Sequence, residues 1–197
     1  SSSPERTWNG MTFAMVLREE EESMKILITG NSYYETSAIL RVMQKEFPRE
    51  VAGVENAKEL LDRIRVPEPH SPFSRKCYAR ALYQLQIEKE NLIRDAHPHR
   101  SLVCDHGTLD ALRYWPDTRE SFFLEQKTTW ETELQRYDWV LQVEDPHPFQ
   151  SSRDFSIEGR DGELWSRHPH YMKYEAVRGF TKCCVEIAAL LKKILHL

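Results

Sequence analysis

The chain has 197 residues, enough for one domain with a substantial core, and its 27 basic and 31 acidic side chains give a net charge of −4. This balance argues against a nucleic-acid partner, and no apolar run approaches the roughly 20 residues that a membrane-spanning helix needs. The four cysteines show no zinc-binding spacing, so we expect reduced thiols in a cytoplasmic protein.

Residues 1–23 differ in composition from the rest of the chain. They begin with SSSP and end with REEEES. We therefore expect an N-terminal extension that is partly disordered and lies outside the core, with a short helix or strand at about 12–18. The domain proper is predicted over residues 24–197, with no internal repeat and no long linker.

Strand and helix patterns alternate along this domain. The predicted strands are 25–29, 51–54, 101–104, 139–143 and, more weakly, 171–174. The predicted helices are about 37–46, 57–64, 74–96, 119–136, 157–166 and 179–195, with loops at 66–73 and 145–156. This order predicts a three-layer α/β/α fold with a mainly parallel five-stranded sheet.

Ligands of open α/β sheets bind beyond the carboxyl ends of the strands. Asp105 is the strongest candidate there, because it follows a buried strand, where nucleotide-hydrolysing proteins keep the acid that holds Mg²⁺. A helix cap or turn residue explains Asp105 equally well. Glu55, after the second strand, and Asp110, near the start of a helix, are further candidates, although Glu55 is more simply read as a solvated loop acid.

Arginines recur every seven residues at Arg153, Arg160 and Arg167. A series of this kind could form a basic lid over phosphates, with Arg160 as a nucleotide contact. A solvated helix face explains the same spacing. The loop histidines match no zinc-site spacing and are read as surface residues.

The segment ITGNSYYETSAIL, residues 28–40, has the layout of a phosphate-binding P-loop, G-x-x-x-x-G-K-[ST]. Gly30 ends a strand, and Ser37, seven residues later, is expected to open a helix. Glu35 stands at the second glycine of that motif and Thr36 at its lysine, and Asn31 is a further altered position. The side chains of Tyr33, Tyr34 and Glu35 restrict the backbone curl that cradles phosphates.

The two altered positions allow an estimate of the lost affinity for a nucleotide. Replacing the lysine with Thr36 removes a charge-assisted hydrogen bond of roughly 1.5–3 kcal/mol. The Glu35 carboxylate, about 4 Å from a phosphate, costs on the order of 4 kcal/mol. The sum is about four to five decades in affinity, so we expect no cofactor. Without a nearby lysine, Asp105 is predicted to accept hydrogen bonds from Ser37 or from the backbone N–H groups at 107–108.

Six segments together resemble a known family: KILITG, VENAKELL, YARALYQLQIEKE, LVCDHGTLDALRYWPD, RYDWVLQVE and WSRHPHY. They are similar to the small AAA-type P-loop ATPases that include the ribosylnicotinamide-kinase domain of bacterial NAD regulators and the TRPL-translocation-defect proteins. The resemblance covers about 24–195 and implies a nucleotide site at Gly30, Ser37, Glu55 and Asp105. The chain departs from the family at 31–36, at His106, which replaces an arginine, and in the lid at 154–156.

Two functions of different classes follow from this pattern. The first is a kinase-like protein with a degraded P-loop that is not catalytic and binds a protein partner or a small-molecule ligand. The alternative is an ATP- or GTP-binding NTPase or small-molecule kinase with an atypical P-loop, in which Asp105 and Ser37 would hold Mg²⁺. A third possibility is a site that holds an anion or a phosphorylated small molecule without hydrolysis.

Overall fold

The computed structural model describes residues 23–30, 33–144, 164–175 and 180–197, without the side chains of 33–35, 180 and 181. Its five strands form one sheet in the order β2-β3-β1-β4-β5, and every neighbouring pair is parallel. The strands are β1 (Lys25–Gly30), β2 (Val51–Val54), β3 (Ser101–Asp105), β4 (Trp139–Glu144) and β5 (Tyr171–Glu175). The predicted five-stranded α/β fold is confirmed.

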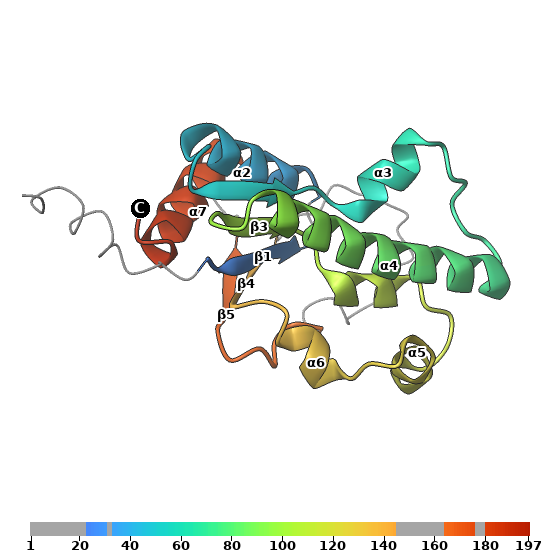
Figure 1. The fold of residues 1–197 in the computed structure, drawn as a ribbon. Helices are drawn as coiled ribbons and strands as arrows, with labels where there is room; N and C mark the ends of the chain where they lie inside the picture. Colours follow the sequence, from blue (N-terminus) through green and yellow to red (C-terminus); the bar gives the residue numbers. More distant parts are fainter. Residues whose placement is uncertain (1–22, 31–32, 145–163, 176–179) are drawn as a thin grey trace, which may run out of the picture.

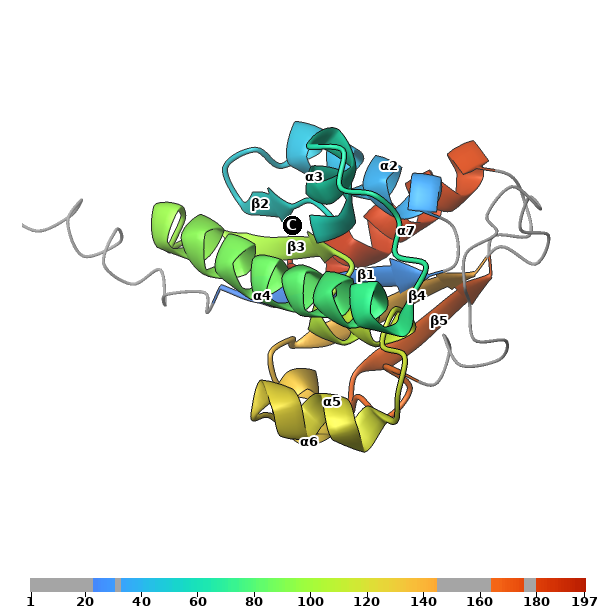
Figure 2. The same ribbon diagram turned by 90° about the vertical axis from the view of Figure 1, so that its right-hand side faces the viewer.

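Helices cover both faces of the sheet. Successive side chains of a strand point to opposite faces, and in β1 the apolar side chains on each face pack against helices. Ile26 and Ile28 of β1 pack in a cluster with α2 (Tyr33–Glu46) and α7 (Phe180–Ile194), which lie side by side on one face (Figure 1). Leu27 packs in a second cluster with α4 (Pro72–Ala96) on the other face (Figure 2). The three layers were expected from the alternation of strands and helices.

The remaining elements also lie on the α4 side of the sheet. They are α3 (Ala57–Arg63), the 3₁₀ helix η1 (Thr108–Arg113), α5 (Arg119–Gln126) and α6 (Trp130–Leu134). A single helix over 119–136 was predicted, and that prediction is wrong. Lys127 takes a left-handed conformation with φ of 53° after α5, and the Thr129 side chain caps the start of α6, so two helices form where the apolar spacing indicated one.

Several other sequence predictions can be placed on the structure. The helix predicted at 74–96 begins two residues earlier, with Pro72 in its first turn after the Ser71 cap. The loop at 145–156 lies outside the described residues, as does most of the helix predicted at 157–166, whose last residues form a turn. Among the helices described, none is long and apolar enough to cross a membrane. None of the four cysteines forms a disulfide.

Candidate functional site

The carboxyl ends of β1, β2 and β3 bring three of the predicted segments to one edge of the sheet. Gly30 ends β1, Asp105 ends β3, and Glu55 follows β2 directly. β1 pairs with β3 on one side and with β4 on the other, so the strands that follow in the chain are added first on one side of β1 and then on its other side. This is the position at which open α/β sheets bind their ligands.

The helix after β1 begins earlier than the P-loop layout predicts. Helix α2 starts at Tyr33, only three residues after Gly30 and four before Ser37, so the prediction of a start near Ser37 is wrong. No glycine or proline occurs between residues 31 and 46, so nothing in this stretch opposes an early helix. The positions of Tyr33, Tyr34, Glu35 and Thr36 therefore belong to the first turns of α2 instead of a long loop.

Gly30 matches the first glycine of the P-loop motif, and its neighbours give it a structural role. A Cβ atom added there would lie 1.8 Å from the backbone oxygen of Val143 and 2.8 Å from its carbonyl carbon. Gly30 and Val143 are register partners in the pairing of β1 with β4. The close approach of the two strands therefore requires glycine at this position.

Asp105 is fully buried, and protein groups occupy both of its oxygens. Oδ2 accepts a hydrogen bond from Ser37 Oγ at 2.7 Å, the contact that the sequence predicts for an acid without a nearby lysine. Oδ1 lies 2.8 Å from His106 Nδ1. Burial alone would raise the pKa of Asp105, but hydrogen bonds from His106, Ser37 and Thr36, together with the charge of His106, hold that pKa below its ordinary value.

His106 turns back onto Asp105 because its backbone is left-handed, with φ of 64°. Histidine is one of the few residue types enriched in this region. Its N–H donates to the backbone oxygen of Ile28 at 2.8 Å, and its own carbonyl accepts from Gln86 at 3.2 Å. Burial acts to lower the pKa of His106, while the hydrogen bond and charge of Asp105 raise it above its ordinary value. The two side chains thus form a buried ion pair at the end of β3.

A second acid also reaches Ser37. Ser37 Oγ lies 2.9 Å from Glu59 Oε1 in α3, in addition to its contact with Asp105. A hydroxyl has one proton and donates to one carboxylate at a time. Two carboxylates therefore converge on one serine, and each also has a basic partner, His106 for Asp105 and Arg63 at 3.4 Å for Glu59.

Lys89 of α4 supplies a positive charge to the same region. Its Nζ donates to the backbone oxygen of Glu55 at 2.5 Å. Burial lowers the pKa of Lys89, and the acids Glu55, Glu59 and Asp105 oppose that shift. The Glu55 side chain itself is about half exposed and pairs with Arg63 at 3.1 Å.

Asp110 connects the turn after β3 to the central strand β1. Its Oδ2 accepts the Gly107 N–H at 2.7 Å, and its Oδ1 accepts the Thr29 hydroxyl at 3.1 Å and lies 3.2 Å from Arg113. Asp110 is buried. Both oxygens of the Asp110 carboxylate therefore already have protein partners.

Kinases with a P-loop act on nucleotides bound with Mg²⁺, which the P-loop serine and an acid after a strand hold in place. Ser37 and Asp105 have the residue types for this role. Asp105, however, has one oxygen on Ser37 and the other on His106, and it is 0% exposed. Within the described part of the chain, no group of three or more His, Cys, Asp or Glu side chains could hold a metal ion. A Mg²⁺ ion at Asp105 would therefore have to displace Ser37 or His106 from its carboxylate.

The other predicted site residues fall in different places. Asn31 and Arg160 lie outside the described residues, and the side chain of Glu35 is not described. Thr36, at the position of the P-loop lysine, is fully buried against Asp105. The structure therefore brings Gly30, Thr36, Ser37 and Asp105 together around the end of β1 and β3.

Sequence reasoning missed two residues of this site, Glu59 and Lys89. Glu59 lies in the first turn of α3, four residues after Glu55, so its proximity to Ser37 depends on the path of the chain between β2 and α3. Lys89 lies in the middle of the 25-residue helix α4, among other charged residues. No local pattern separates either residue from a solvated surface charge.

Comparisons with known proteins support a fold and no more. No protein-family model matches the sequence, and neither does any curated protein. Among solved structures, the thymidylate kinase from Ehrlichia chaffeensis is similar, with a TM-score of 0.57 over 86% of this chain and 98% of that chain, at 12% identity. The finer resemblance to the ribosylnicotinamide-kinase group is not tested by these matches and stays a prediction. The similarity to the thymidylate kinase and the parallel five-stranded sheet together give this chain the fold of a P-loop kinase.

Proposed function

We propose that this protein is a non-catalytic member of the P-loop kinase fold, which does not use a nucleotide and acts by binding a partner or a small-molecule ligand. The observation that carries this proposal is the start of α2 at Tyr33. A P-loop binds phosphates through backbone N–H groups that point inward from a loop of several residues. In a helix that starts at Tyr33, the N–H groups from residue 36 onward bond to carbonyls of the helix instead.

The charges around the crevice support the same proposal. Asp105 and Glu59 converge on Ser37, where a nucleotide phosphate would have to approach. An unpaired carboxylate near a phosphate costs on the order of 4 kcal/mol at an effective dielectric of 20, and the pairing of Asp105 with His106 and of Glu59 with Arg63 reduces that cost. Lys89 offsets part of this repulsion, but its Nζ already donates to the backbone of Glu55.

One observation favours the alternative, a kinase or NTPase with an atypical loop. Ser37 and Asp105 keep the residue pair that binds Mg²⁺ in active P-loop proteins, and they are 2.7 Å apart. For Asp105 to serve a metal, His106 would have to leave its carboxylate. The alternative therefore requires a rearrangement that Mg-nucleotide binding would have to drive.

Thermal unfolding with Mg-ATP and Mg-GTP separates the two functions. A nucleotide at 100 times its Kd stabilises a protein by about 2.7 kcal/mol, which raises the Tm of a chain of this size by about 5–10 °C. We expect no increase at millimolar concentrations of either nucleotide, because α2 starts at Tyr33 and Asp105 is already engaged by Ser37 and His106.

The matched control is Ser37→Ala, which removes the hydroxyl between the two acids. A nonspecific effect of the nucleotide would shift the wild type and this variant alike. A rise of several degrees in the wild type that disappears in Ser37→Ala would instead establish a nucleotide site and overturn the proposal.

A further inference from the structure

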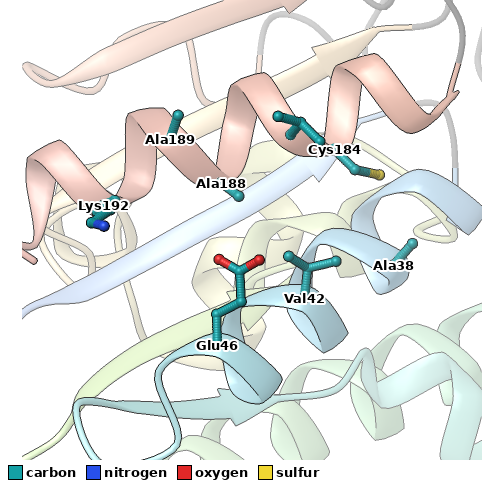
Figure 3. A pocket seen from close by; sticks show the side chains of 8 residues that line it. Ala38, Val42, Glu46, Cys184, Ala188, Ala189 and Lys192 are labelled. Carbon is teal, nitrogen blue, oxygen red and sulfur yellow. The ribbon is translucent and has the colours of Figure 1, made fainter.

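A buried carboxylate outside the candidate site lies close to the turn that follows β3. Glu90 of α4 is 1% exposed, and both of its oxygens accept hydrogen bonds. Its Oε1 accepts from Gln86 Nε2 at 2.8 Å and from the Tyr137 hydroxyl at 2.6 Å, and its Oε2 accepts from Lys25 Nζ at 2.9 Å. We call these four residues the Glu90 network. The groove of about 450 Å³ between α2 and α7 lies on the other face of the sheet and is lined by none of them (Figure 3).

Two members of the Glu90 network also bind the backbone of the turn that follows β3. A glutamine side-chain amide has two N–H groups. The Gln86 amide donates to the Glu90 carboxylate and to the backbone oxygen of His106, the latter at 3.2 Å. The Tyr137 hydroxyl donates its proton to Glu90 and accepts the backbone N–H of Thr108 at 3.1 Å. One carboxylate oxygen of α4 therefore orients both side chains that hold the turn.

The hydrogen bonds of the network are protected by burial. Gln86, Glu90 and Tyr137 are at most 2% exposed, so water does not compete for their partners. Burial and the charge of Glu90 raise the pKa of Tyr137 well above its ordinary value, so its hydroxyl keeps the proton that it donates. The turn is also closely packed, because a Cβ atom added at Gly107 would lie 2.9 Å from the Tyr137 hydroxyl oxygen.

The network holds a backbone conformation that carries strain. His106 has a φ of 64°, in the left-handed region that residues with a Cβ atom adopt at a cost. A residue keeps such a conformation only where its surroundings fix it. In this conformation His106 Nδ1 lies 2.8 Å from Asp105 Oδ1 and occupies one oxygen of the acid. Opening of the turn would relieve the backbone of His106 and would release Asp105.

We propose that the Glu90 network holds the turn 106–108 closed and thereby keeps His106 on Asp105, as an autoinhibitory contact. A cation or hydrogen-bond donor that enters the crevice reaches this oxygen of Asp105 only after α4 has released the turn. The contacts of α4 therefore control access to the acid at the end of β3. This inference goes beyond the proposed function and holds whether or not the crevice takes a nucleotide, which the melting experiments test separately.

Carboxyl labelling of the full-length protein with a carbodiimide and glycine ethyl ester, read by peptide mass spectrometry, tests this inference. Gln86→Leu keeps a side chain of similar size and removes both hydrogen bonds of the amide. Asp105 is expected to be labelled about tenfold faster in Gln86→Leu than in the wild type, because losing a buried hydrogen bond raises the population of the open turn by that order. Tyr137→Phe keeps the ring, removes the hydroxyl, and is expected to act in the same direction.

Glu90→Gln is the matched control within the network. It keeps a side-chain oxygen that accepts from Gln86 and Tyr137, but it removes the charge that pairs with Lys25. The turn is therefore expected to stay closed, and Asp105 is expected to be labelled at close to the wild-type rate.

One tryptic peptide, residues 128–136, supplies both controls for the labelling itself. It contains the exposed Glu131 and the fully buried Glu133. Glu133 accepts hydrogen bonds from Thr128 and Arg136, which lie outside the Glu90 network. Glu131 is expected to be labelled fast and Glu133 slowly in the wild type and in every variant.

Three results would overturn the proposal. An unchanged rate at Asp105 in both Gln86→Leu and Tyr137→Phe would mean that α4 does not hold the turn. Faster labelling of Asp105 and Glu133 together would mean that the fold has loosened as a whole. Labelling of Asp105 as fast in Glu90→Gln as in Gln86→Leu would assign the effect to the lost ion pair. Because Gln86→Leu and Tyr137→Phe act independently, either one decides the test if the other does not fold.

Discussion

Gly30→Ala is expected to lower the free energy of unfolding by about 3 kcal/mol or more, measured by urea denaturation. The added Cβ atom would lie 1.8 Å from the backbone oxygen of Val143, far inside contact distance. Val143 is paired with Gly30 between the two central strands β1 and β4. The clash can be relieved only by moving one strand, which disrupts the hydrogen bonds of that pair.

Gly53→Ala is the matched control, since Gly53 also lies in a strand of the same sheet. Its added Cβ atom would approach the side chain of Gln44 at 2.4 Å, and Gln44 can move by rotating its flexible end. We expect a cost below about 1 kcal/mol. Equal losses in Gly30→Ala and Gly53→Ala would show that the close approach of β1 and β4 is not what requires Gly30.

Asp105→Ala is expected to cost about 3 kcal/mol, because it leaves His106 buried without its partner. It also removes the acceptor for Ser37 Oγ. The free energy of unfolding at pH 5.5, measured by urea denaturation, gives this cost directly. Asp62→Ala is the control: Asp62 forms an exposed ion pair with Lys58 within α3, and its loss is expected to stay within about 0.5 kcal/mol.

The cost of Asp105→Ala is expected to depend on pH in a defined direction. The folded pKa of Asp105 is lowered, so its contribution is present above its unfolded pKa near 4 and lost as pH falls through the folded value. The folded pKa of His106 is raised, so its contribution is present below about pH 6.5 and lost as pH rises through the folded value. The pair therefore stabilises most between about pH 4 and 6.5.

Denaturation at pH 5.5 and at pH 9 tests that direction. The difference between the wild type and Asp105→Ala is expected to shrink toward pH 9, because the stabilisation from His106 is lost as pH rises through its raised pKa. A difference that grows toward pH 9, or one below about 1 kcal/mol at pH 5.5, would contradict a buried ion pair at the end of β3.

The strands could be predicted from the sequence because buried parallel strands form short apolar runs. β2 was predicted at its observed bounds, and β1, β3, β4 and β5 differ from prediction by one residue at the carboxyl end. Their order in the sheet was not predicted, since pairing between β1 and β4 joins residues more than 100 positions apart. Local pattern carries no information about contacts at that separation.

The start of α2 was predicted wrongly because the P-loop layout and the residues between Gly30 and Ser37 indicate different starts for the helix. The template places the helix at Ser37, but the intervening residues include no glycine that would keep a loop open. Asp105 was found from its place after a strand. His106 was identified only as a departure from a family pattern. Residue spacing does not predict the left-handed backbone that brings the His106 ring against Asp105.

The central claim is that residues 33–36 are helical and that the N–H groups after Gly30 do not bind phosphate. The most direct test is a titration of the isotope-labelled protein with Mg-ATP, followed by NMR on the backbone amides and Cα atoms of residues 30–37. We predict helical Cα shifts from Tyr33 onward and no saturable change of these amide signals at millimolar nucleotide. Saturable amide shifts across residues 30–37, with loss of the helical Cα shifts at 33–36, would contradict the account.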